Sequence, residues 1–96
     1  MSPFKKRKLK ILRNKLDNLD NSFIKLIKKR TYLVDQVLRL KDYKNQIVDK
    51  NRIKIILNKI RYKSIKNNID PKITNRIWKN MIWSYINYEK RNFKKK

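Results

Sequence analysis

Cations at helical spacing are the residues in this sequence whose type and position could do chemistry. Arg13, Arg30 and Lys41 lie in or beside a run of apolar residues that recur every three or four positions from Leu9 onward. A guanidinium does not lose its proton, so an arginine in such a seam must meet an anion, either a neighbouring carboxylate or a bound ligand. Lys41 follows Arg30 by eleven positions, which places both side chains on the same side of a helix. The pair favours an anion-binding site.

Arg13 cannot reach the same small ligand as Arg30 from one helix. The two arginines are seventeen positions apart, which is about 25 Å at roughly 1.5 Å per residue. A helix from Leu9 to Lys41 would be about 50 Å long, roughly twice the diameter of a compact domain of this size. Much of its apolar seam would be wet in a single chain, so we expect a symmetric homodimer in which two chains share the site.

The residue inventory excludes several kinds of chemistry. The chain has neither cysteine nor histidine, which removes disulfides, cysteine-ligated zinc, thiol nucleophiles and the commonest general base. We therefore expect no metal and no cofactor. No apolar run reaches the length of a membrane span, and the basic N-terminal residues are not followed by the apolar core of a signal peptide. The expected location is the cytoplasm.

The charge balance has two interpretations. The 96 residues include 29 Lys and Arg against 7 Asp and Glu, for a net charge of +22. A non-enzymatic, basic helical nucleic-acid-binding protein would carry such charge along one outer face and would bind less tightly as salt rises. The chain also lacks glycine and alanine and is rich in Lys, Asn and Ile, which is the bias of an AT-rich gene and would place lysines on any tolerant surface. We favour a small anionic substrate over nucleic acid.

The elements that must position these residues are three helices, and no segment has the alternation of a strand. Residues 1–8 are expected to be a basic, flexible lead-in, followed by a long helix over Leu9–Lys41 and a loop over 42–48. Asp49 is a plausible N-cap of a short second helix that ends near Asn67. Asp70 and the proline after it open a medium third helix that continues to position 93, and residues 94–96 form a lysine tail. The fold class is all-α, in one domain over 9–93.

Apolar periodicity predicts which faces of the later helices are buried. The face of the second helix is Ile53, Ile56, Leu57 and Ile60. The stripe of the third helix is Ile73, Ile77, Trp78, Met81, Ile82, Tyr85, Ile86, Glu89 and Phe93. Glu89 is the sole glutamate in the chain. Trp83 and Tyr88 are expected to be packing or surface residues.

The pattern resembles the all-helical, type II chorismate mutase family over residues 9–93. The matching positions are Leu12-Arg13, Leu16-Asp17, Leu19-Asp20, Leu26-Ile27, Arg30, Val34, Val37, Lys41, Val48-Asp49, Arg52, Ile69-Asp70, Arg76-Ile77-Trp78, Tyr85 and Glu89. The resemblance implies an intertwined helical homodimer with three helices per chain and two equivalent sites. It also implies the isomerisation of chorismate to prephenate, a step of phenylalanine and tyrosine biosynthesis that needs no metal, nucleophile or cofactor.

The resemblance also implies a role for each site residue. Arg30 and the Arg13 of the partner subunit would grip the two carboxylates of the substrate, and Lys41 would reach its ether oxygen. Asp49 would lie near the ring hydroxyl; the alternative is that it only caps its helix, and it can do both. The remaining residues would be Arg52 as an electrostatic support and Tyr85 and Glu89 as the closing side from the third helix.

Three positions depart from the family pattern. Ile53 stands where these mutases usually carry Glu or Gln, and Tyr85 stands where bacterial mutases have a small polar residue. Both departures are similar to a sister group, the isochorismate-pyruvate lyases, whereas Asp49 is similar to the mutases. The prediction is therefore a mutase, with the lyase and a decayed enzyme as alternatives. Glu89 replaces a common glutamine, and only its protonated form could donate to a developing oxyanion, so activity is expected to decline as pH rises and Glu89 ionises.

Overall fold

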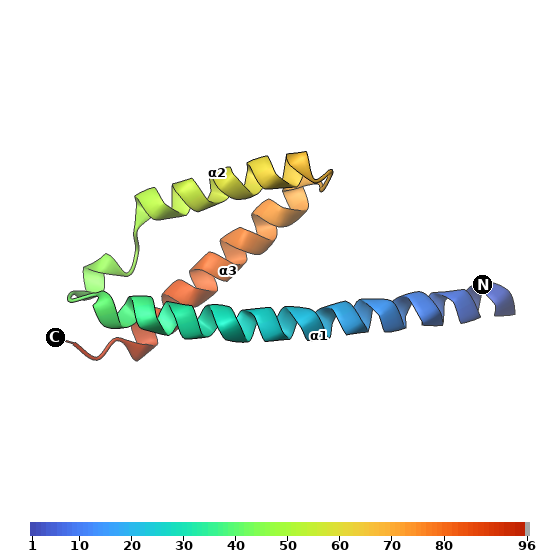
Figure 1. Cartoon of the computed structure of the whole chain (residues 1–96), viewed down its shortest axis with the longest axis horizontal. Helices are drawn as coiled ribbons and strands as arrows, with labels where there is room; N and C mark the ends of the chain where they lie inside the picture. The colour runs from blue at the N-terminus through green and yellow to red at the C-terminus, as the bar shows by residue number, and fades with distance from the viewer. Residues whose placement is uncertain (96) are drawn as a thin grey trace. The chain divides into compact units, whose positions relative to one another are not determined.

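The computed structural model describes residues 1–95 and is built from helices. Their order is α1 (Pro3–Leu40), the short 3-10 helix η1 (Lys44–Gln46), α2 (Lys50–Lys66) and α3 (Pro71–Asn92) (Figure 1). Residues 1–95 contain no strand. The all-α prediction and the long, short, medium order of the three α-helices are confirmed. The chain divides into two compact units, Met1–Leu33 and Val34–Lys96, and α1 contributes to both.

The first helix begins earlier than its apolar periodicity indicated. Residues 3–8 are helical, so the frayed lead-in predicted over 1–8 is wrong for these positions. The signal that was missed is the Ser2-Pro3 pair. The Ser2 hydroxyl accepts a hydrogen bond from the Lys5 N–H at 3.2 Å, as an N-cap does. Pro3 then occupies the first helical position, where its missing N–H costs nothing.

The unit Met1–Leu33 is helical from Pro3 onward and leaves its apolar seam in solvent. Leu9 is half-buried, but from Leu12 onward the exposed fraction of the seam residues runs from 50% at Leu12 to 60% at Leu26, and Leu16, Leu19, Phe23 and Leu33 are each 58% exposed. A lone amphipathic helix gains no packing energy from such a face. This part of α1 therefore has the sequence of a packed helix without a packing partner in one chain.

The unit Val34–Lys96 holds the hydrophobic core. Its buried members are Leu38 from the end of α1, Ile47 from the loop, and Ile82 and Ile86 from α3. Helix α2 packs on α3, and all four residues of its predicted face are half-buried. Each α3 residue predicted to be buried from Trp78 onward is buried or half-buried.

Two residues of the predicted α3 stripe are exposed. Ile73 is 56% exposed and Ile77 is 48% exposed. At roughly 100° per residue, both project about 140–180° away from Ile82, which is buried in the core. The apolar residues of α3 cover more than one face, so the stripe was assigned too broadly at its start.

Capping side chains fix the ends of α2 and α3. Asp49 accepts from the Arg52 N–H at 3.0 Å, and Asp70 accepts from the Lys72 N–H at 2.9 Å, so both predicted N-caps are confirmed. The turn between the helices requires a left-handed residue, and Asn68 supplies it with φ of 58°. Asparagine takes this position in a chain that has no glycine.

Every helix within residues 1–95 is too short or too polar to cross a lipid bilayer.

Candidate active site

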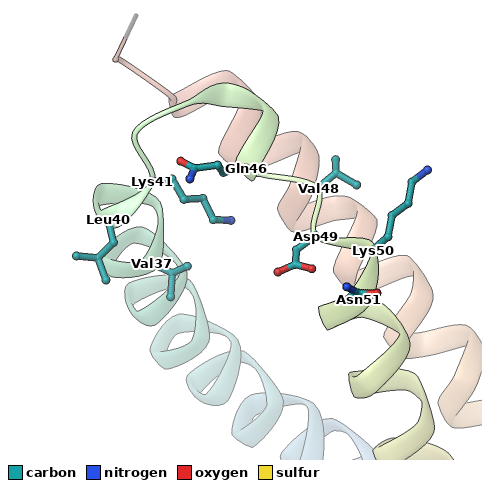
Figure 2. A pocket seen from close by; sticks show the side chains of 8 residues that line it. All are labelled: Val37, Leu40, Lys41, Gln46, Val48, Asp49, Lys50 and Asn51. Carbon is teal, nitrogen blue, oxygen red and sulfur yellow. The ribbon is translucent and has the colours of Figure 1, made fainter.

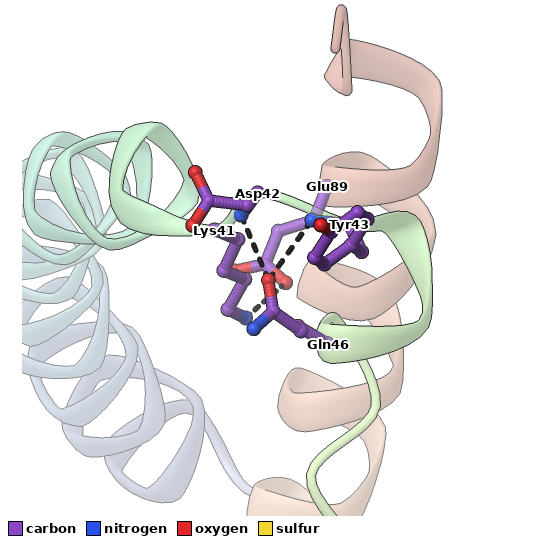
Figure 3. Close-up of polar contacts among 5 residues, drawn as sticks. All are labelled: Lys41, Asp42, Tyr43, Gln46 and Glu89. Carbon is purple, nitrogen blue, oxygen red and sulfur yellow. Dashed lines mark hydrogen bonds and ion pairs between the residues drawn. The ribbon is translucent and has the colours of Figure 1, made fainter. Parts of the chain in front are cut away.

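An ion pair joins the end of α1 to α3 at the candidate site. Helix α1 ends at Leu40, and Lys41 is the next residue. Its ammonium group lies 3.2 Å from Oε2 of Glu89 on α3 (Figure 3). Only 19% of the Lys41 side chain and 9% of the Glu89 side chain are exposed. The predicted inward projection of Glu89 is confirmed, since the whole residue is only 6% exposed.

A surface hollow brings Lys41 together with Asp49. It has a volume of about 670 Å³ and lies between the last turn of α1 and the first turn of α2. The lining side chains are those of Val37, Leu40, Lys41, Gln46, Val48, Asp49, Lys50 and Asn51 (Figure 2). The side chains of Lys41 and Asp49 both extend into the space between these two helix ends. A hollow of this size accommodates a small organic molecule.

Asp49 is placed to cap α2 and to line this hollow at once. Its Oδ1 accepts from the Arg52 N–H, and the residue is also part of the lining. The capping function alone would account for an aspartate here, but its exposed carboxylate also faces the hollow. The Arg52 side chain is exposed and does not line the hollow.

Gln46 is a lining residue that the sequence analysis missed. It lies in η1, where its side-chain Oε1 accepts from the Asp42 N–H at 2.7 Å and from the Tyr43 N–H at 2.9 Å (Figure 3). The side chain therefore closes the turn that follows Lys41. The sequence signal was weak, because a glutamine three residues after Tyr43 suggests a capping contact but not a pocket.

Tyr85 has a neighbour on α3 that ties this helix to α1. The Tyr85 and Tyr88 rings pack edge to face, with their centroids 6.3 Å apart and an interplanar angle of 88°. The Tyr88 hydroxyl donates to Oδ1 of Asp35 at 2.7 Å. This hydrogen bond, with some burial, raises the pKa of Tyr88, because a phenolate would face the Asp35 carboxylate. Tyr85 itself is half-buried and does not line the hollow.

The two arginines predicted to grip carboxylates belong to the other unit. Arg13 is exposed and Arg30 is half-buried, both within Met1–Leu33. They are separated by about 25 Å along one continuous helix, so the argument that one small ligand cannot touch both from a single chain holds.

The charges of the hollow do not favour a dianion by themselves. Lys41 and Lys50 supply two positive charges, while Asp49 and the Glu89 that faces Lys41 carry two negative charges. A dianionic ligand needs further cations to balance it. Among residues 1–95, no group of three or more carboxylates could hold a metal ion.

The fold is that of an all-helical domain, and its surface hollow is lined by Lys41 and Asp49. Residues 12–90 match the chorismate mutase type II family, and the chain belongs to this family. No curated protein and no solved structure matches the chain.

Proposed function

We propose that this protein is a chorismate mutase that converts chorismate to prephenate. The family supports chemistry of this type in general. The observation that supports the mutase most is the position of Lys41, whose ammonium group extends into a hollow that Asp49 also lines. Lys41 is the residue that we assign to the breaking ether bond.

The residues present suit this reaction. The rearrangement occurs within one molecule and transfers no proton, so it requires neither a nucleophile nor a general base. Catalysis comes from holding the folded conformer of the substrate and from placing positive charge where the ether oxygen becomes negative. A lysine that is only 19% exposed is screened less by water than a surface lysine would be. Arg30 and the Arg13 of the partner subunit would supply the cations that a dianion still needs.

The exposed seam of α1 supports a homodimer. A second copy of the same helix would cover Leu16, Leu19, Phe23 and Leu26, each at least 58% exposed in one chain. The same pairing would place Arg13 of one chain in the site of the other chain, about 25 Å from the Arg30 of its own chain. Dimerisation and completion of the site are thus one event in this proposal.

The first experiment is a direct assay with chorismate. Purified protein is incubated with chorismate, its loss is followed by absorbance, and prephenate is identified as the product. Arg30→Ala is assayed alongside, at matched concentration and helical content. Saturable turnover that Arg30→Ala abolishes supports the proposal. Absence of turnover at every pH from acidic to neutral contradicts it.

A mixing experiment tests whether Arg13 acts in the partner's site. Arg13→Ala and Arg30→Ala are each expected to be inactive alone. A dimer of one copy of each holds one intact site, since its Arg30 and its Arg13 come from different chains. Because random exchange makes about half of the dimers mixed, about one quarter of the wild-type activity should return. If Arg13 acted in its own chain's site, mixing would restore nothing.

A lyase that releases pyruvate from isochorismate is the second candidate. Ile53 is half-buried and packs against the core cluster, so this side chain supplies no hydrogen bond to a ring hydroxyl. The assay is pyruvate release from isochorismate by the same preparation. Release faster than prephenate formation would favour the lyase over the mutase.

A further inference from the structure

The carboxamide of Gln46 can have only one orientation in this structure. Its Oε1 accepts hydrogen bonds from two backbone N–H groups, those of Asp42 and Tyr43. If the amide were flipped, its NH₂ group would face both of these donors without an acceptor. Oxygen must therefore face the backbone. The Nε2 group, with two N–H donors, is left to face away from the turn.

This donor group lies in the candidate site. Gln46 lines the same hollow as Lys41 and Asp49. Both close views place its carboxamide beside the Lys41 side chain (Figures 2 and 3). The turn at η1 fixes the direction of this carboxamide, because its Oε1 is held by the two backbone hydrogen bonds. The hollow thus contains an oriented neutral donor next to its cation.

We infer that Gln46 binds the substrate directly, by donating a hydrogen bond from Nε2 to an oxygen of the anion that Lys41 holds. This inference rests on the proposed function, since it takes the ligand of the hollow to be the chorismate dianion. The carboxamide of Gln46 is neutral, so it can donate a hydrogen bond to an oxyanion, whereas a carboxylate at the same position would repel that oxyanion. It also supplies a side-chain amide to a site in which position 53 is isoleucine packed against the core.

The variant that separates binding from capping is Gln46→Glu. A glutamate keeps an oxygen that accepts from the Asp42 and Tyr43 N–H groups, so the turn is retained, but it loses the donor. It also adds a negative charge, which would weaken anion binding from anywhere in the hollow. Asn51→Asp is the matched control, because Asn51 lines the same hollow and its replacement adds the same charge. Gln46→Met removes donor and acceptor without adding charge.

The measurement is kcat/KM for chorismate, with the free energy of unfolding measured for each variant. We expect kcat/KM of Gln46→Glu to be about tenfold or more below that of Asn51→Asp, because a donor to a charged oxygen is lost. We expect kcat/KM of Gln46→Met to be lower than that of the wild type by a similar factor. Unfolding should change little, since both backbone contacts of Gln46 are exposed and water can replace them.

The outcomes distinguish this inference from the proposed function. Wild-type turnover with Gln46→Glu equal to Asn51→Asp would overturn the role of Gln46 and leave the mutase intact. If the wild type binds chorismate by calorimetry without converting it, the same comparison is made on dissociation constants, with the same expected order. If the wild type neither converts nor binds chorismate, the proposed function and the inference both fail.

Discussion

Removing the charge of Lys41 should destabilise the protein much more than removing the charge of Glu89. Lys41→Met keeps most of the volume of the lysine stem but deletes the ammonium group. Glu89 would then keep a carboxylate with 9% of its side chain exposed and no cation at 3.2 Å. Glu89→Gln keeps an oxygen that can accept from the Lys41 ammonium group, so the contact persists in a neutral form.

The burial of the two side chains sets the size of the difference. Removing one partner of a fully buried ion pair costs about 3–5 kcal/mol. Lys41 is 19% exposed and water reaches it, so about 2–3 kcal/mol is the expected loss for Lys41→Met. For a chain of this length, that loss lowers Tm by about 10–20 °C. Glu89→Gln should cost about 1 kcal/mol or less, because the hydrogen bond is kept.

The assay is urea unfolding followed by circular dichroism at one protein concentration, for both variants and the double variant. In the double variant a neutral amide replaces the stranded carboxylate, so it should recover about 1–2 kcal/mol relative to Lys41→Met. Equal losses in the two single variants, or no recovery in the double variant, would refute the reasoning.

The same variants separate stability from catalysis. Lys41→Met should lower kcat by about 10²–10³-fold at a temperature where it is folded, since a cation at the developing charge is lost. Glu89→Gln should keep most of the activity, because a carboxamide donates a hydrogen bond at every pH. A loss of kcat in Glu89→Gln as large as the loss in Lys41→Met would refute this assignment of roles.

Three further predictions concern residues around the site. Asp49→Asn keeps the N-cap of α2, so unfolding should change by no more than about 0.5 kcal/mol, while a loss of kcat/KM for chorismate would show a role beyond capping. The pKa of Tyr88 is raised, so the stability that its contact with Asp35 provides is present below the ordinary tyrosine pKa and is lost as pH rises through the folded pKa. Urea unfolding of Tyr88→Phe should therefore show a smaller loss of the free energy of unfolding at alkaline pH than the wild type does. Leu16 is 58% exposed in one chain and lies in the seam that a second copy would cover, so Leu16→Lys should halve the mass measured by sedimentation and abolish turnover. An unchanged mass and an unchanged turnover would contradict the proposed dimer.

The sequence was a good guide where the local signal is strong. Asp49 and Asp70 were placed correctly because a capping carboxylate at the start of a helix is a short-range contact. Glu89 was placed in the buried face because its position follows from periodicity alone. The start of α1 was missed because Ser2-Pro3 stands in a basic stretch without apolar periodicity, and a cap there outweighed the pattern.

Long-range pairings were beyond the sequence. Nothing in the pattern pairs Asp35 with Tyr88, because the contact joins residues 53 positions apart. Gln46 was missed for a related reason, since its role depends on the shape of the turn after Lys41. The exposure of Ile73 and Ile77 shows the converse limit, because a helix with apolar residues on several faces does not reveal which face the core takes.

The absence of glycine has a consequence for the segment that carries Gln46 and Asp49. From Lys41 to Asp49 every residue has a β-carbon, so the unfolded segment has fewer backbone conformations to lose than a glycine-bearing loop of the same length. Ordering residues 41–49 around a ligand therefore costs less free energy than ordering a glycine-bearing loop of the same length would. The difference originates in the unfolded chain, not in any contact of the folded hollow.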